Sequence, residues 1–284
     1  MNADGLSNVP ASVRQRLLNR IRETGEASNF VWSRYATERL LYRLSASEHA
    51  EHFVLKGAAL FLVWTGEPHR PTMDVDLLAD GEDSDEHLES VFRDLCRADV
   101  VPDGLQFDES SVAAVPIRGG QEYGGFRVKL TAYLGKSPVR ITVDVGFGDA
   151  VTPAAQRITY PTLLDFPAPV LRACPRETVV AEKLHAMVVL GMINSRMKDF
   201  YDLYVLASGF AYRGSTLCQA VRATFDGRTT DLPAEPPVAL TAEFAEDATK
   251  QRQWRAFLSR AGIDDAPAEL SATVAALAEF LDPV

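Results

Sequence analysis

Two aspartates separated by a single residue, Asp74 and Asp76, are the side chains of this sequence best suited to chemistry. The valine, leucine and methionine around them favour a β-strand, whose two-residue period puts both carboxylates on one face. Two adjacent anions repel each other, so the pair becomes useful when a divalent cation lies between them. Mg²⁺ takes one or two carboxylates together with substrate phosphates, so the pair predicts metal-assisted phosphoryl or nucleotidyl transfer. A solvated strand edge is the alternative explanation.

A lysine and a glycine, Lys56 and Gly57, precede Asp74 by eighteen and seventeen positions. We expect a helix to begin near this pair, followed by a turn and then by the strand. Free N–H groups and the positive dipole end at a helix start suit phosphate oxygens, and glycine permits a close backbone approach. The arrangement is typical of a site for a metal-bound triphosphate.

A second charged group lies in the C-terminal half, where Lys183 is followed by Lys198, Asp199 and Asp202. On a helix, Lys183 shares its face with apolar residues such as Met187, so we expect its ammonium group to point at a charged partner. Asp202 lies four residues after Lys198 and three after Asp199, so one helical face can present a cation and two anions. The alternative is a surface ion pair worth about 0.3 to 0.5 kcal/mol.

Strand alternation adds a third carboxylate. Apolar residues occupy the odd positions of 139–145, which leaves Arg140, Thr142 and Asp144 on the other face and makes Asp144 a candidate metal ligand. The histidines show no paired ligand spacing, and neither a Gly-x-Ser-x-Gly nor a Gly-x-x-x-x-Gly-Lys-Ser/Thr motif is present. Hydrolase and P-loop functions are therefore disfavoured.

The elements that must position these side chains fall into two parts, which predicts a mixed α/β (α+β) lobe over 1–160 and a helical lobe over 161–284. The first lobe should contain helices at 13–24, 29–44, 57–65 and 83–98, and β-rich segments at 111–117, 126–134 and 139–145 with a hairpin at 135–138. Proline and glycine in 146–175 predict a linker between the lobes. Helices are then expected at 177–190, 197–208, 217–225, 244–261 and 268–281.

Composition is that of an ordinary globular protein, with 284 residues, 46% of them hydrophobic. No apolar stretch approaches the roughly 20 residues of a membrane helix, and the N-terminus shows no secretory signal, so we expect a cytoplasmic protein. Three scattered cysteines indicate neither a zinc site nor disulfides. A net charge of −10 argues against indiscriminate nucleic-acid binding, yet residues 1–50 carry seven arginines: Arg14, Arg16, Arg20, Arg22, Arg34, Arg39 and Arg43.

Four ordered blocks of this sequence closely resemble the AbiEii/AbiGii toxin family, bacterial nucleotidyltransferase-fold proteins of toxin–antitoxin and phage abortive-infection systems. The blocks are residues 35–45, residues 53–58, residues 70–76, and Glu182-Lys183 with Lys198-Asp199-x-x-Asp202. The resemblance implies a DNA polymerase β-like nucleotidyltransferase core with a mixed sheet, followed by a helical lobe, with the active site between them.

The resemblance also assigns roles. It implies that Asp74 and Asp76 hold Mg²⁺, with Asp144 as third carboxylate from the general nucleotidyltransferase pattern. Lys56, Gly57 and Thr72 would lie against the triphosphate. Lys183, Lys198, Asp199 and Asp202 would complete the site, with Lys183 neutralising phosphate charge and Asp199 or Asp202 orienting that lysine or acting as base.

Two departures from the family pattern stand out. Ala58 replaces the second glycine of the usual Lys-Gly-Gly, and its methyl would restrict the backbone if that residue needs a positive φ. Pro71 replaces the usual serine before Thr72, which removes one hydroxyl and one N–H.

Established relatives add nucleotides to RNA, notably to tRNA acceptor ends, which blocks translation. The resemblance thus implies transfer of NMP from an NTP to an RNA 3′ hydroxyl, with the N-terminal arginines as a track for a tRNA stem; solvation of two helices is their alternative role. Nucleotidylation of a protein or small molecule is a second hypothesis, and a nucleotide-binding module without turnover, suggested only by Ala58, is a third. The family also implies a cognate antitoxin.

Overall fold

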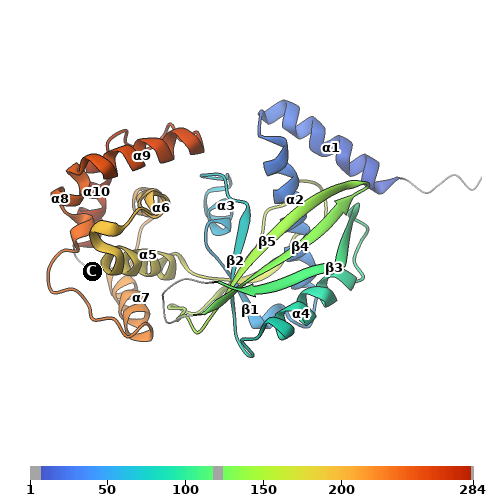
Figure 1. Cartoon of the computed structure of the whole chain (residues 1–284), viewed down its shortest axis with the longest axis horizontal. Helices are drawn as coiled ribbons and strands as arrows, with labels where there is room; N and C mark the ends of the chain where they lie inside the picture. Colours follow the sequence, from blue (N-terminus) through green and yellow to red (C-terminus); the bar gives the residue numbers. More distant parts are fainter. Residues whose placement is uncertain (1–7, 118–123, 283–284) are drawn as a thin grey trace, which may run out of the picture. The chain divides into compact units, whose positions relative to one another are not determined.

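The computed structural model describes residues 8–117 and 124–282. Contacts within the chain divide it into two compact units, each described separately below. Unit 1 comprises the residues up to Gly148 together with Arg157–Ala173, and unit 2 comprises Asp149–Gln156 together with the residues from Cys174 onward. Figure 1 shows a β-sheet with helices in unit 1 and only helices as regular elements in the later part of the chain. The predicted α/β class with a helical C-terminal part is confirmed.

Unit 1 is built around a seven-stranded mixed sheet with the order β3-β4-β5-β2-β1-β7-β6. Strand β2 lies at its centre, antiparallel to β1 and parallel to β5. Residues with buried and accessible side chains alternate along β5, as expected for a sheet with one face against the core. The strands are β1 Phe53–Lys56, β2 Asp74–Ala79, β3 Leu105–Pro116, β4 Gly125–Leu134, β5 Ser137–Phe147, β6 Gln156–Thr159 and β7 Val170–Ala173.

Helices α2 and α4 pack against this sheet and form the hydrophobic core of unit 1 with it. Helix α2 packs against β5 and β7, and α4 packs against β3 and β4. Helix α1 ends at Gly25, whose φ of 72° forms a left-handed cap. The helices of unit 1 are α1 Val9–Thr24, α2 Ser28–Ser45, the 3₁₀ turn η1 Ala50–His52, α3 Ala59–Thr65 and α4 Asp85–Arg97.

Helix α3 begins two residues later than the sequence pattern indicates. Lys56 is the last residue of β1, and Gly57 forms the turn with a φ of 69°, which lies outside the helical region. The expected helix at 57–65 is therefore a strand end, a glycine turn and a short helix. The lysine and the glycine are held by the sheet rather than by the helix.

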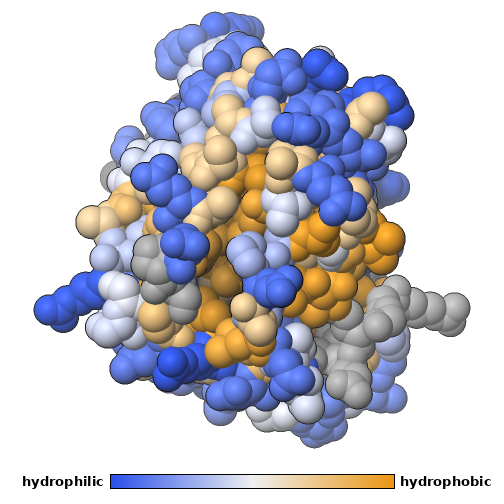
Figure 2. All heavy atoms as spheres, turned by 90° about the vertical axis from the view of Figure 1, so that its left-hand side faces the viewer, coloured by the Kyte–Doolittle hydropathy of each residue, from blue (hydrophilic) through white to orange (hydrophobic). Residues whose placement is uncertain are grey.

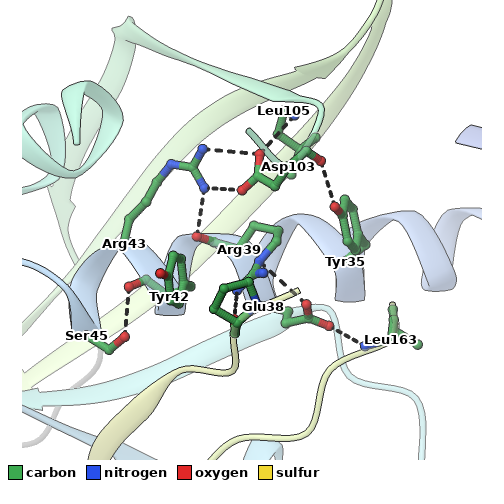
Figure 3. A network of polar contacts seen from close by, with 10 residues as sticks. Tyr35, Glu38, Arg39, Tyr42, Arg43, Ser45, Asp103, Leu105 and Leu163 are labelled. Atoms are coloured by element: carbon green, nitrogen blue, oxygen red, sulfur yellow. Dashed lines mark hydrogen bonds and ion pairs between the residues drawn. The ribbon is translucent and has the colours of Figure 1, made fainter. Parts of the chain in front are cut away.

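A buried polar network on α2 ties distant segments of unit 1 together (Figure 3). Arg43 makes two hydrogen bonds, of 2.6 and 3.3 Å, to the carboxylate of Asp103. Arg39 donates to the carbonyl of Pro167 at 2.7 Å, and the Leu163 N–H donates to Glu38 at 2.6 Å. These charges are buried, with Arg39 completely inaccessible, so the network acts within the fold.

The same network corrects one expectation from the sequence. Arg39 and Arg43 cannot form part of a surface track for RNA, because both are buried among the partners just described. Arg20 and Arg34 pair with Glu26 at 3.4 and 3.8 Å. Exposed arginine side chains in this region remain on α1, at Arg14 and Arg22.

The segment 146–175 is more than the linker predicted from its prolines and glycines. It contains β6 and β7, and β7 pairs in parallel with β1, where Val54 lies opposite Arg172. This pairing returns Arg157–Ala173 to unit 1, so the units do not divide at residue 160 as the sequence indicates. Two short strands within a proline-rich stretch give little periodicity, which explains why the pattern reads as a linker.

Unit 2 consists of short helices packed on one another. The long helix expected at 244–261 is two helices, because Asp247 leaves helical geometry with a ψ of 127° and its side chain accepts hydrogen bonds from Thr249 and Lys250 as an N-cap. The helices are α5 Arg176–Leu190, η2 Gly191–Ile193, α6 Met197–Gly209, α7 Gly214–Gly227, η3 Val238–Leu240, α8 Ala242–Glu246, α9 Ala248–Ala261 and α10 Leu270–Leu281.

The surface carries both polar and apolar side chains. The face drawn in Figure 2 has hydrophilic groups around its border and apolar groups among them. Within unit 2, the large apolar side chains with the greatest exposure are Val189, Met192, Ile193 and Leu232. Among the described helices, none has the length and apolar character needed to cross a membrane.

Candidate active site

The two aspartates of the opening motif lie at the start of β2, at the centre of the sheet of unit 1. Asp74 is exposed and Asp76 is partly exposed, whereas Val75 and Leu77 between and after them are buried. The carboxylates therefore share the accessible face of the strand, as strand alternation predicts. Helix α2 packs against the neighbouring β5, so the apolar residues of this part of the sheet are covered.

Four charged residues form a row across neighbouring strands beside this pair. Lys56 on β1 is paired with Asp76 on β2, and Asp76 with Asp144 on β5. Asp144 is in turn paired with Arg127 on β4. Directly opposite residues of neighbouring strands share one face of a sheet and lie about 5 Å apart. From β1 to β4, the row thus consists of a cation, two anions and a second cation. Asp74 lies two residues before Asp76 on β2.

Asp144 and Arg127 form a two-point charged contact within this row. The Nε and Nη2 atoms of Arg127 donate to the two carboxylate oxygens of Asp144 at 2.8 and 2.7 Å. These hydrogen bonds, the charge of Asp144 and the charges of Asp74 and Asp76 hold the pKa of the Arg127 guanidinium above its ordinary value. Arg127 therefore stays protonated and balances part of the negative charge of the site.

The turn that follows β1 fits closely around Asp76. A Cβ atom added to Gly57 would lie 1.9 Å from Oδ2 of Asp76, and φ at this residue is +69°. Both facts require glycine at position 57. Ala58 adopts ordinary right-handed helical angles, with φ −67° and ψ −21°. The substitution of alanine for the usual second glycine of the family is thus accommodated without backbone strain.

A small pocket adjoins Asp74 on the side of α2 and α3. It is lined by Thr72 and Arg70 from the loop before β2, by Arg34 of α2 and by apolar residues around them. The Thr72 hydroxyl donates to the carbonyl of Asp74 at 3.3 Å. Thr72 therefore lies next to Asp74, with its hydroxyl directed at the backbone.

The oxygen donors of Asp74 and Asp76 fit a hard cation such as Mg²⁺, which prefers carboxylates and keeps further positions for water or phosphate. The close approach of the Gly57 backbone to Asp76 leaves no space for a side chain beside that carboxylate. Within residues 8–117 and 124–282, no group of three or more His, Cys, Asp or Glu side chains is arranged to hold a metal ion. Asp74 and Asp76 are therefore candidate metal ligands by the chemistry of their oxygen donors.

Unit 2 brings together three of its four predicted site residues. Lys183 of α5 donates from Nζ to Asp199 at 2.8 Å and to Asp202 at 2.7 Å, both on α6. Both aspartates are buried, at 1% exposure. Burial lowers the pKa of Lys183, but the two carboxylates outweigh burial and leave the pKa above its ordinary value. The prediction that Lys183 points at a charged partner is confirmed, and the lysine is a fixed cation.

Lys198 and Asp199 behave differently from the sequence pattern. Lys198 is exposed while Asp202 is buried, so the alternative of a surface ion pair between them does not fit. Asp199 contacts Lys183 through Oδ1 and Arg196 through Oδ2, the latter at 2.6 Å. Both carboxylate oxygens of Asp199 thus contact a cation.

Sequence reasoning missed the two arginines that pair with these carboxylates, Arg127 and Arg196. A signal for Arg127 exists in the predicted hairpin at 135–138. Leu134 lies opposite Ser137, and that register carries Arg127 to the position opposite Asp144. Arg196 precedes Asp199 by three residues at the start of α6, a spacing that brings side chains together on a helix.

Comparison with known proteins finds a family and similar solved structures. The family model described as nucleotidyl transferase AbiEii toxin, type IV TA system, matches residues 39–280. None of the curated proteins matches the chain. Among solved structures, JHP933 from Helicobacter pylori is similar, with 14% identity, 86% of each chain covered and a TM-score of 0.47. A Helicobacter pylori protein provisionally described as a nucleotidyltransferase is 13% identical, with a TM-score of 0.48. The match covers 90% of the present chain and 94% of the Helicobacter pylori chain.

Proposed function

We propose a function from the premise that this chain belongs to the AbiEii nucleotidyl transferase toxin family and is a nucleotidyltransferase. The proposed reaction is the transfer of NMP from an NTP to an RNA 3′ hydroxyl, most favourably that of a tRNA. Mg²⁺ is the proposed cofactor and pyrophosphate the second product. The result in a bacterial cell would be a block of translation. The observation that carries the proposal is the carboxylate pair of β2, set against the close-fitting turn at Gly57.

In this mechanism the residues of unit 1 bind the nucleotide through its phosphates. Asp74 and Asp76 would hold the metal, which when bound lowers the pKa of an attacking hydroxyl and stabilises the leaving phosphates. Lys56 and the Gly57 backbone lie on the β1 side of Asp76, where they can bind triphosphate oxygens. Thr72 lies on the other side, next to Asp74.

The residues of unit 2 are proposed to act in the same reaction. Lys183 is held as a permanent cation by Asp199 and Asp202, so it is suited to neutralising phosphate charge in the transition state. Asp202 remains the candidate for a base, and exposed Lys198 for an additional phosphate contact. Conservative variants of Lys183 and Lys198 that fold normally but lose transfer would support these roles; full activity in both would remove them.

The RNA part of the proposal rests on family membership and on the remaining exposed arginines of α1. Arg14→Glu and Arg22→Glu should weaken RNA binding and flatten its salt dependence, because each removed phosphate contact lowers the salt slope by about 1. Arg172→Glu, on β7 of the same unit, is a control for general charge effects. Binding that is unchanged in the α1 variants would remove the proposed track.

The acceptor is tested by incubating the purified chain with each α-labelled NTP and Mg²⁺ in the presence of total RNA, protein extract or neither. Label in the tRNA fraction would support the proposal. Label in protein would support nucleotidylation of a polypeptide instead, and label in a small product would indicate a soluble acceptor. A cognate antitoxin protein is expected from the type IV toxin–antitoxin family, and the proposed substrates place the reaction in the cytoplasm.

A further inference from the structure

Arg127 is tied to the candidate metal-binding carboxylate that does not lie on β2, Asp144. Both oxygens of Asp144 accept hydrogen bonds from its guanidinium, at 2.8 and 2.7 Å. Such two-point arginine–carboxylate pairs fix the orientation of the carboxylate as well as its position. Arg127 belongs to β4 and Asp76 to β2, on opposite sides of β5. The carboxylate of Asp144 is therefore held from the β4 side through both of its oxygens.

Arg127 lies within the electrostatic reach of all three carboxylates, since Asp144, Asp74 and Asp76 all act on its guanidinium. Asp76 and Asp144 are register partners on neighbouring strands, so their side chains start close together. Without a cation between them, three carboxylates repel one another, and the guanidinium stabilises the third by neutralising its charge.

The ion pair of Arg127 and Asp144 is also accessible enough to solvent to be broken. The side chains of Arg127 and Asp144 are 41% and 22% exposed, so water can replace their hydrogen bonds. A buried pair such as that of Arg43 and Asp103, exposed by only 6% and 2%, has no such freedom. The contact of Asp144 with Arg127 is thus strong enough to set the orientation and accessible enough to be exchanged for another cation.

We propose that Arg127 is a positioning residue that holds Asp144 away from the metal site in the nucleotide-free protein and releases it when metal and nucleotide bind. Arg127 and a divalent ion then compete for the same carboxylate. The consequence is weak metal binding without nucleotide, so that the site is completed only with substrate present. This inference rests on the proposed function, because it takes Asp74 and Asp76 as the metal ligands.

The test is a titration of the full chain with Mn²⁺ in the absence of nucleotide. Electron paramagnetic resonance measures the concentration of free Mn²⁺ and so gives the binding affinity. Arg127→Gln should tighten Mn²⁺ binding by at least about tenfold, because it removes a nearby cation and frees Asp144. Asp144→Asn should change binding little in the parent but should abolish the gain in the Arg127→Gln background. Lys129→Gln is the matched control, since Lys129 lies two residues along the same strand, opposite Thr142, and should have a much smaller effect.

Three results would overturn the inference: no change in Arg127→Gln, weaker Mn²⁺ binding in that variant, or a gain that survives Asp144→Asn. Weaker binding would mean that Arg127 orients Asp144 for the metal instead. Thermal unfolding of each variant excludes misfolding as the cause. Asp74→Asn separates this inference from the proposed function. If this variant still binds Mn²⁺, the metal site itself is misassigned. If the variant loses Mn²⁺ binding, an unchanged affinity in Arg127→Gln overturns only the role of Arg127.

Discussion

The backbone of Gly57 lies directly against the carboxylate of Asp76, so closely that a methyl group at position 57 would overlap Oδ2 at 1.9 Å. Gly57→Ala should therefore displace Asp76. We expect nucleotidyl transfer to fall by about 100-fold or more, since shifts of about 1 Å at a reacting centre have that effect. The left-handed φ adds about 1 kcal/mol of destabilisation.

The matched control is Gly25→Ala, which has a similar φ of 72° but no heavy atom within 4 Å of the added Cβ. It should lose comparable stability and keep its activity. Transfer assays and thermal unfolding of both variants check this expectation. Equal activity in the two variants would show that the contact with Asp76 has no catalytic importance.

Ala58 provides a second test of the same turn. Because its angles are right-handed helical and its side chain is buried at 9% exposure, restoring the usual glycine should not increase activity. Ala58→Gly should instead lower the free energy of unfolding by about 0.5 to 1 kcal/mol. Steady-state transfer rates and denaturant unfolding measure both effects. A large gain in kcat would mean that the methyl group does impede the nucleotide.

Lys183 is predicted to contribute to stability as well as to catalysis. Lys183→Met leaves Asp202 buried without this cation and leaves Asp199 with Arg196 alone, and removing one partner of a buried pair costs about 3 to 5 kcal/mol. Urea unfolding of the variant and the parent tests this. Lys198→Met, at an exposed position of the same unit, should change stability by no more than about 0.5 kcal/mol.

Glu38 should make stability depend on pH. Burial raises its pKa to about 7, against an ordinary value of 4.5, even though the Leu163 N–H and Arg39 oppose the shift. Between these two values the folded protein binds more protons than the unfolded chain, so the free energy of unfolding falls as pH rises through this window. The contribution is at most about 3 kcal/mol.

Glu38→Gln keeps an acceptor for Leu163 and removes the titration. Denaturant unfolding at pH 5 and pH 8 should show a smaller difference for the variant than for the parent. Identical pH dependence in the two proteins would mean that Glu38 does not titrate in this range.

The sequence predicts local features of this protein well where a period is long and simple. The alternation in 139–145 correctly places Asp144, and the helical spacing of apolar residues in 29–44 gives α2 to within one residue at each end. Apolar neighbours of Lys183 correctly indicate a buried charge partner. These features depend on the side chains of one element, which is the information that a local pattern contains.

Features set by contacts between distant segments could not be predicted in this way. Arg39 and Arg43 look like surface cations on a helix, yet Pro167 and Asp103 bury them. The strand β7 is too short to show a period and exists because β1 offers it a partner. In both cases the partner lies far away in the chain. Arg127 is different, because the register of the predicted hairpin already brings it opposite Asp144.

The most direct test of metal-dependent transfer at the β2 carboxylates compares the parent with Asp74→Asn and Asp76→Asn. The assay measures transfer of labelled NMP to tRNA, with variants whose thermal unfolding matches that of the parent. The account predicts label in the tRNA for the parent, its loss on chelation with EDTA, and a loss of about 1,000-fold or more in each variant. Transfer that persists in both variants, or in EDTA, would contradict the assignment of these two aspartates.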